Sequence, residues 1–163
     1  MNPLSTAPRT KFTPPVGHAR HVPREPLLDA IGQTQARLVL VRAPAGFGKT
    51  TLMAQARQRL DDPGVATPWL TLDSADNDPS RFMACLGRAL GELAALEFDA
   101  GQASGAAVPL GEAAIRLFEQ VAAIPFAFAF FLDEFEVVHS PAVLALVAQL
   151  LECIPAGSRL VIG

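Results

Sequence analysis

The sequence has few lysines and no concentration of basic charge. Its 163 residues include 13 basic and 16 acidic side chains, which give a formal charge of −3, and lysine occurs only at positions 11 and 49. The arginines are scattered and form no basic stripe, which argues against a nucleic-acid surface. We therefore expect no direct nucleic-acid binding by this segment.

Cysteine and long apolar runs are also scarce. Cys85 and Cys153 lie far apart inside apolar helical patterns, which indicates reduced core thiols instead of a disulfide or metal framework. His18, His21 and His139 lack metal-ligand spacing. No stretch reaches about 18 consecutive apolar residues, and the N-terminus has no apolar core of signal-peptide length. We expect a cytoplasmic protein without a membrane segment.

What the chain does contain is an alternation of strand and helix patterns. The apolar half of its composition suffices for one core. Strands are predicted at 37–41, 66–73, 125–134 and 159–163, and helices at 24–32, after 48, within 77–96, at 111–123 and after 140. In the segment 77–96, Asp78 is expected to be the N-cap and Pro79 the first helical residue. This order predicts a doubly wound parallel α/β sheet with helices on both faces. In the third strand, phenylalanines 126, 128 and 130 should fill one face of the sheet, while alanines on the other let a helix approach.

Two segments are predicted to lie outside the regular elements. Residues 1–17 are rich in proline and should form an extended leader that is not part of a packed helix. Residues 100–108 are predicted to be a flexible surface loop. The domain would then be 18–163, truncated after its fourth strand.

A candidate phosphate-binding loop lies between the first strand and the following helix. Residues 43–50 match G-x-x-x-x-G-K-[ST], except that Ala43 replaces the first glycine. Glycines can adopt φ > 0 and turn backbone N–H groups toward phosphate oxygens. Lys49 would reach the β- and γ-phosphates, and Thr50 would ligate Mg²⁺. The predicted nucleotide-binding residues in this loop are Ala45, Gly46, Phe47, Gly48, Lys49, Thr50 and Thr51.

An acidic pair follows the third strand. Asp133 and Glu134 end the apolar run "FAFFLDE", where a second metal-side acid would be needed. Asp133 is predicted to hold Mg²⁺, and Glu134 to orient or deprotonate the attacking water as the catalytic residue. Glu136 is a weaker candidate and is expected to face solvent.

Beyond these motifs, the sequence resembles the ATPase module of MalT-type LuxR regulators, ATP-dependent transcriptional activators of the STAND class of P-loop ATPases. The resemblance rests on "KFTPP" (11–15), "HVPREPLL" (21–28), "APAGFGKTTL" (43–52), "WLTLDSADNDPSRF" (69–82) and "FFLDEFEVV" (130–138), in the family's order. It implies an ASCE-type P-loop sheet, incomplete at its C-terminus, in which "RLVIG" inserts between the strands that precede the loop and the acidic pair. It also implies ATP and Mg²⁺ as cofactors.

The resemblance carries further expectations about residues and partners. Val22 and Arg24 would border the adenine pocket, although Pro23 stands where related ATPases often have glycine. The acidic and polar residues of "DSADND" would order their loop. The sensor, helical-repeat and DNA-binding domains of such regulators would be partners that this chain lacks. ATP and ADP would bias a switch, with slow hydrolysis expected only in a full-length protein.

Two other functions remain open. A stand-alone small-molecule kinase could use the same loop, but such kinases need an arginine-rich lid, and only Arg159 follows the third strand. Alternatively, the chain could be a non-functional remnant whose unpaired sheet edge promotes self-association.

Overall fold

The structure is a computed structural model that describes residues 7–15, 24–61, 64–94 and 108–163. Its centre is a four-stranded sheet formed by β1 (Leu38–Leu40), β2 (Trp69–Thr71), β3 (Ala129–Asp133) and β4 (Arg159–Ile162). All neighbouring strands are parallel, in the order β1-β4-β3-β2. The predicted insertion of "RLVIG" is therefore confirmed, because β4 lies between β1 and β3.

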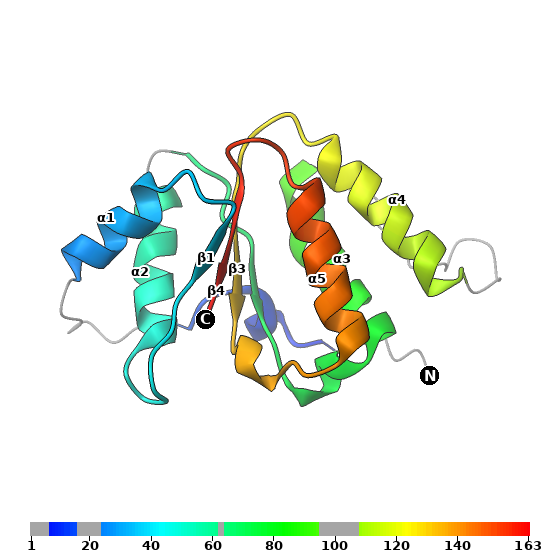
Figure 1. Cartoon of the computed structure of the whole chain (residues 1–163), viewed down its shortest axis with the longest axis horizontal. Coiled ribbons are helices and arrows are strands. Elements are labelled where there is room, and N and C mark those ends of the chain that lie inside the picture. Colours follow the sequence, from blue (N-terminus) through cyan, green and yellow to red (C-terminus); the bar gives the residue numbers. More distant parts are fainter. Residues whose placement is uncertain (1–6, 16–23, 62–63, 95–107) are drawn as a thin grey trace.

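Helices cover both faces of this sheet (Figure 1). On one face, α1 (Glu25–Gln33) and α2 (Lys49–Asp61) pack against Trp69, Phe131 and Val161. On the other face, α3 (Pro79–Ala94), α4 (Leu110–Ala122) and α5 (Pro141–Cys153) enclose the larger apolar cluster. The prediction of a parallel α/β sheet with helices on both faces is confirmed.

Strand β3 shows how alternating side chains serve the two faces. Phe128 and Phe130 lie in the cluster under α3, α4 and α5, whereas Ala129 lies in the cluster under α1 and α2. This is the predicted division of aromatic and small side chains. Phe126 does not join it, because it precedes the strand and is exposed. Phe131 contributes an aromatic ring to the alanine face, where it stacks on Trp69.

Other boundaries differ modestly from the predicted ones. The strand predicted at 66–73 consists of an isolated bridge between Ala66 and Phe128, followed by β2. Helix α3 begins at Pro79, the first helical position that the sequence predicts. In α5, Leu144 is exposed, whereas Val143 and Val147 are buried. The predicted loop at 100–108 lies outside the described residues up to position 107.

The described part of the predicted leader is not simply extended. Arg9–Phe12 forms a short 3-10 helix, η2, in which Lys11 is buried and Phe12 packs against the larger cluster. The guanidinium of Arg88 lies 4.3 Å from the centre of the Phe12 ring, a cation–π contact. The prediction failed because proline content indicates an irregular backbone but says nothing of the long-range contacts of Lys11 and Phe12.

Candidate functional site

The loop between β1 and α2 adopts the glycine conformations that suit phosphate binding. Gly46 and Gly48 have φ values of 81° and 79°, in the left-handed region where side chains are strained. At Gly48, an added Cβ would also lie 3.4 Å from Arg24 Nη2. Ala43 does not have a positive φ. The first position of the motif therefore makes no conformational demand for glycine.

Helix α2 begins at the end of this loop and presents two polar side chains. Lys49 is its first residue, so both Lys49 and Thr50 lie among the free N–H groups and partial positive charge of a helix N-terminus. Thr50 Oγ1 donates a hydrogen bond to Asp133 Oδ1 at 3.0 Å. This bond joins the start of α2 to the carboxyl end of β3. The two residues predicted as metal ligands from separate motifs are thus neighbours.

Asp133 occupies a buried position at the end of its strand. Burial raises the pKa of the Asp133 carboxyl, although the hydrogen bond from Thr50 opposes that effect. A cation beside the carboxylate would offset the desolvation. Hydroxyl and carboxylate oxygens are also the ligand types that Mg²⁺ prefers.

Glu134 takes an unusual backbone conformation directly after this strand. Its φ of 59° and ψ of 34° are left-handed, and among the described residues it is the one non-glycine residue with positive φ. Its side chain is exposed. Such a conformation costs about 1–2 kcal/mol, and strained residues of this kind cluster at functional sites. The strain supports Glu134 as a functional candidate.

Glu136 is exposed, as expected, but it also pairs with a residue of the candidate site. It lies in η4 (Phe135–Val137), and its Oε1 accepts a hydrogen bond from Lys49 Nζ at 2.6 Å. That hydrogen bond lowers the pKa of the Glu136 carboxyl. Sequence reasoning missed the pair because the two residues are 87 positions apart. The sequence did offer one hint. The segment "DEFE" has three acidic residues, and it follows a strand that ends at the same edge of the sheet as the strand before Lys49.

Arg24 reaches the phosphate loop from the start of α1. Its Nη2 donates to the carbonyl oxygen of Phe47 at 3.0 Å. Phe47 and Ala45 are exposed on the loop, and Thr51 is half-buried in the first turn of α2. Val22, the other residue expected near the adenine, lies outside the described residues together with Pro23 and the first two histidines.

A pocket of about 610 Å³ opens beside the loop. Its walls include the end of β1, the start of the loop, Lys49, Glu136 and the end of β4. The pocket therefore lies at the carboxyl ends of parallel strands, where open α/β sheets bind their ligands. Its volume falls within the range of small-molecule and cofactor sites.

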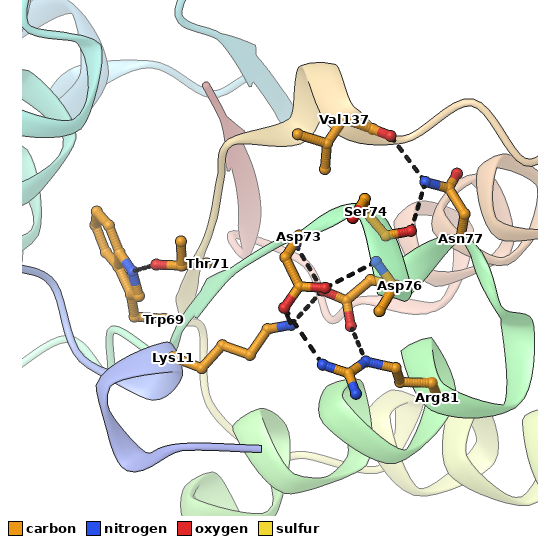
Figure 2. A network of polar contacts seen from close by, with 10 residues as sticks. Lys11, Trp69, Thr71, Asp73, Ser74, Asp76, Asn77, Arg81 and Val137 are labelled. Atoms are coloured by element: carbon orange, nitrogen blue, oxygen red, sulfur yellow. Dashed lines mark hydrogen bonds and ion pairs between the residues drawn. The ribbon is translucent and has the colours of Figure 1, made fainter. Parts of the chain in front are cut away.

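A partly buried ionic cluster lies at the end of β2 (Figure 2). Lys11 Nζ contacts Asp73 Oδ2 at 2.7 Å and also pairs with Asp76, whose side chain is fully buried. Arg81 reaches both carboxylates at 3.3 Å. Asp73 and Asp76 also form a capping box on η3 (Ser74–Asn77), which confirms the loop-ordering role expected for them. Lys11, the partner of both, was not predicted.

Asn77 connects this cluster to the segment after the acidic pair. Its Nδ2 donates to the carbonyl oxygen of Val137 at 2.8 Å, as Figure 2 shows. Its Oδ1 accepts from the backbone N–H groups of His139 and Ser140 at 2.8 and 2.9 Å. One side chain thus fixes the end of η4 and the start of α5. Because η4 carries Glu136, Asn77 holds the backbone that presents this carboxylate to Lys49.

The tryptophan and the two cysteines lie away from the candidate site and have structural roles. Trp69 is buried and donates from Nε1 to Thr71 Oγ1 at 2.8 Å. Cys85 and Cys153 are free thiols. Burial and the nearby charge of Asp76 raise the pKa of the Cys85 thiol, as expected for a cysteine in an apolar core.

The described residues match neither the pattern of a metal-binding cluster nor that of a membrane-spanning helix. Within the described ranges, no group of three or more His, Cys, Asp or Glu side chains is arranged to hold a metal. In the part of the chain that the structure covers, no helix has the length and apolar character to cross a membrane.

Comparison with known proteins finds relatives among two kinds of bacterial protein. No family model matches the chain. It is 41% identical over 85 residues to the serine/threonine-protein kinase PknK of Mycobacterium tuberculosis (strain ATCC 25618 / H37Rv), which covers 52% of the chain and 8% of that protein. It is 32% identical over 140 residues to the HTH-type transcriptional regulator MalT of Cronobacter sakazakii, which covers 82% of the chain and 15% of that regulator.

The chain is also similar to a second MalT protein. The chain is 43% identical over 82 residues to MalT of Serratia proteamaculans, which covers 50% of the chain and 9% of that protein. The chain therefore spans only a small part of the length of these relatives. Across most of its own residues, it is similar to one segment of MalT transcriptional regulators.

Proposed function

We propose that this chain is an ATP-binding, Mg²⁺-dependent switch segment of a MalT-like transcriptional regulator. The observation that carries the proposal is the contact between Thr50 Oγ1 and Asp133 Oδ1 at 3.0 Å. It brings two oxygen ligands together beside Lys49, at a helix N-terminus that follows a loop with left-handed glycines. Each of these features suits a nucleotide phosphate with its Mg²⁺.

The strand order supports the ASCE type of P-loop sheet. Strand β4 separates β1, which leads into the loop, from β3, which ends at Asp133. This is the insertion that the resemblance implies. Because β4 lies between them, the end of β3 with Asp133 is not adjacent to β1 and its loop. The hydrogen bond from Thr50, in the first turn of α2, connects the two.

The residues divide the work of binding and hydrolysis. Backbone N–H groups of the loop would bind phosphate oxygens, with Lys49 on the β- and γ-phosphates. Thr50 and Asp133 would hold Mg²⁺, which neutralises phosphate charge when bound. Glu134 would orient or deprotonate the attacking water. The exposed position of its carboxylate after a strained turn is compatible with that role.

The relatives favour a switch over a stand-alone enzyme. Similarity extends to proteins that are named as a kinase and as transcriptional regulators, and in each the matching segment is a small part of a long chain. A function common to both would be one that controls other domains. Binding of ATP or ADP would do this by favouring different conformations of the whole protein.

The alternative function, a stand-alone kinase, would need Arg159 as the arginine of a lid over the phosphates. Arg159 Nη1 donates to the carbonyl oxygens of Ile31 and Gly32 at 2.6 and 3.1 Å. These bonds satisfy the last carbonyls of α1 and tie this helix to β4. Arg159 is thereby engaged in the fold and does not extend toward the pocket beside Lys49.

Thermal unfolding with and without MgATP tests the proposal. At about 100 times its dissociation constant, the ligand should stabilise the fold by about 2.7 kcal/mol. For a chain of this size, that corresponds to a rise in Tm of about 5–10 °C. Lys49→Ala should abolish the rise, whereas Arg116→Ala, which removes an exposed cation on α4, should leave it unchanged. The absence of a rise in the unmodified chain would overturn the proposal.

A further inference from the structure

The pair formed by Lys49 and Glu136 bears on how this site selects its ligand. The Lys49 ammonium is the cation that the proposed function assigns to the β- and γ-phosphates, yet it donates to Glu136 Oε1 at 2.6 Å. We propose that Glu136 is an affinity-determining residue, whose carboxylate competes with nucleotide phosphates for Lys49. This inference rests on the proposed function, because it concerns the same lysine.

The carboxylate lies where a phosphate would need to be. Lys49 and Glu136 both line the pocket at the carboxyl ends of β1 and β4, so the pair lies within the cavity that a polyphosphate would enter. A distance of 2.6 Å is typical of a strong, charge-assisted hydrogen bond. Because Glu136 is tethered to the same molecule, its effective concentration at Lys49 is high. A ligand must overcome this internal anion before it can use the lysine.

The environment of the pair makes displacement feasible. Lys49 is 15% exposed, but Glu136 is 50% exposed, so its carboxylate can be hydrated when it leaves. Ion pairs with one such exposed member contribute little free energy. A ligand that carries several phosphate charges can therefore replace one carboxylate, whereas a ligand that does not reach Lys49 gains nothing from the exchange.

The backbone beneath Glu136 is held at both ends. The N–H of Phe135 donates to the carbonyl oxygen of Gly163 at 2.8 Å, and the carbonyl oxygen of Val137 accepts from Asn77 at 2.8 Å. Only the side chain of Glu136 has to rotate for Lys49 to be released. After rotation, the carboxylate remains anchored near the pocket, where it repels an incoming polyphosphate. Both effects lower the affinity for ATP.

Removal of the Glu136 charge should therefore tighten binding. We expect Glu136→Gln to lower the Kd for MgATP about five-fold, the equivalent of an exposed ion pair. AMP, which lacks the β- and γ-phosphates, should bind both proteins equally. Glu112→Gln is the matched control, because Glu112 is also 50% exposed and paired with an arginine, but on α4. It removes the same charge and should leave the Kd unchanged.

The measurement is isothermal titration calorimetry of the whole chain with MgATP and with AMP, alongside thermal unfolding to verify that each variant is folded. Glu136→Ala provides a second variant should Glu136→Gln unfold. Equal MgATP affinities for the unmodified chain and the folded Glu136 variants would overturn the inference and leave the proposed function intact. Weaker binding by the variants would show that Glu136 assists the ligand, which also overturns it. Failure of every protein to bind MgATP would instead defeat the proposed function, and the inference with it.

Discussion

The two lysines of this chain both pair with carboxylates, but in opposite surroundings. Lys11 is 5% exposed and lies between Asp73 and the fully buried Asp76, where Arg81 supplies a second cation. Lys49 pairs with Glu136 alone, and this partner is half exposed at the wall of a pocket. The first group is centred on a fully buried carboxylate that has two cationic partners. The second can exchange its partner.

This difference agrees with a structural role for Lys11 and with the ligand-binding role proposed for Lys49. A buried carboxylate such as Asp76 must keep its cations, because an uncompensated buried charge is strongly destabilising. An exposed carboxylate such as Glu136 can return to water at little cost. Lys11 therefore fixes the loop after β2, whereas Lys49 can exchange its partner for the proposed ligand.

The largest expected effect comes from the same substitution made at each lysine. Lys11→Met removes one of the two cations that pair with Asp76 and should lower the free energy of unfolding by about 3 kcal/mol. Lys49→Met should change it by no more than about 1 kcal/mol, since its partner is half exposed. Methionine retains much of the apolar stem in both cases. Urea denaturation of the two variants measures the comparison, and equal losses would contradict it.

A smaller effect is expected at Asn77, which links the two lysine sites. Asn77→Ala removes its bonds to Val137, His139 and Ser140 and should cost about 2 kcal/mol. Faster amide hydrogen exchange at His139 and Ser140 should accompany the loss. Asn77→Asp keeps the acceptor for both amides but loses the donor to Val137, so its stability should fall between the two. Unchanged exchange at these amides in Asn77→Ala would show that the link does not order the segment.

The smallest expected effect is the response of the two regions to acid. Burial by itself would raise the pKa of Asp73, but the hydrogen bond and charge of Lys11 outweigh it and lower that pKa below 3.8. The hydrogen bond from Lys49 lowers the pKa of Glu136 below 4.5. A carboxyl whose pKa is lower in the folded state stabilises the fold above its unfolded value, and this stabilisation is lost as the pH falls through the folded pKa.

Denaturation curves between about pH 6 and pH 2.5, a range that brackets the ordinary pKa values of both carboxyls, would separate the contributions. Glu136→Gln should flatten the loss of stability that begins near pH 4.5, and Asp73→Asn the loss that begins near pH 3.8. The raised pKa of Asp133 acts in the opposite direction, because protonation of this buried carboxyl favours the folded state. A pH profile that neither substitution alters would exclude both carboxyls as the source of the acid response.

The fold could be predicted because its signals are local. Apolar strands alternate with amphipathic helices, and the spacing of Phe128, Ala129 and Phe130 specifies which face each side chain serves. The left-handed turn before α2 could also be expected, since Gly46 and Gly48 lie within a few residues of one another. Local spacing decides these features.

The ion pairs could not be predicted, because they join distant positions. Lys11 and Asp76 are 65 residues apart, and Lys49 and Glu136 are 87 apart. The sequence shows which residues carry charge, but it does not show which of them form ion pairs with one another. The proline-rich composition of the N-terminal segment also concealed the packing of Lys11 and Phe12. Only the folded arrangement of η2, η3 and η4 reveals these pairings.

The left-handed backbone of Glu134 sets the stability of the fold against the ATP hydrolysis proposed for this residue. Glycine adopts this conformation without the strain that a side chain carries. Directed evolution for heat resistance alone would therefore favour glycine at position 134 and discard the carboxylate proposed to handle the attacking water. A selection that demands both properties would have to find its added stability elsewhere in the chain.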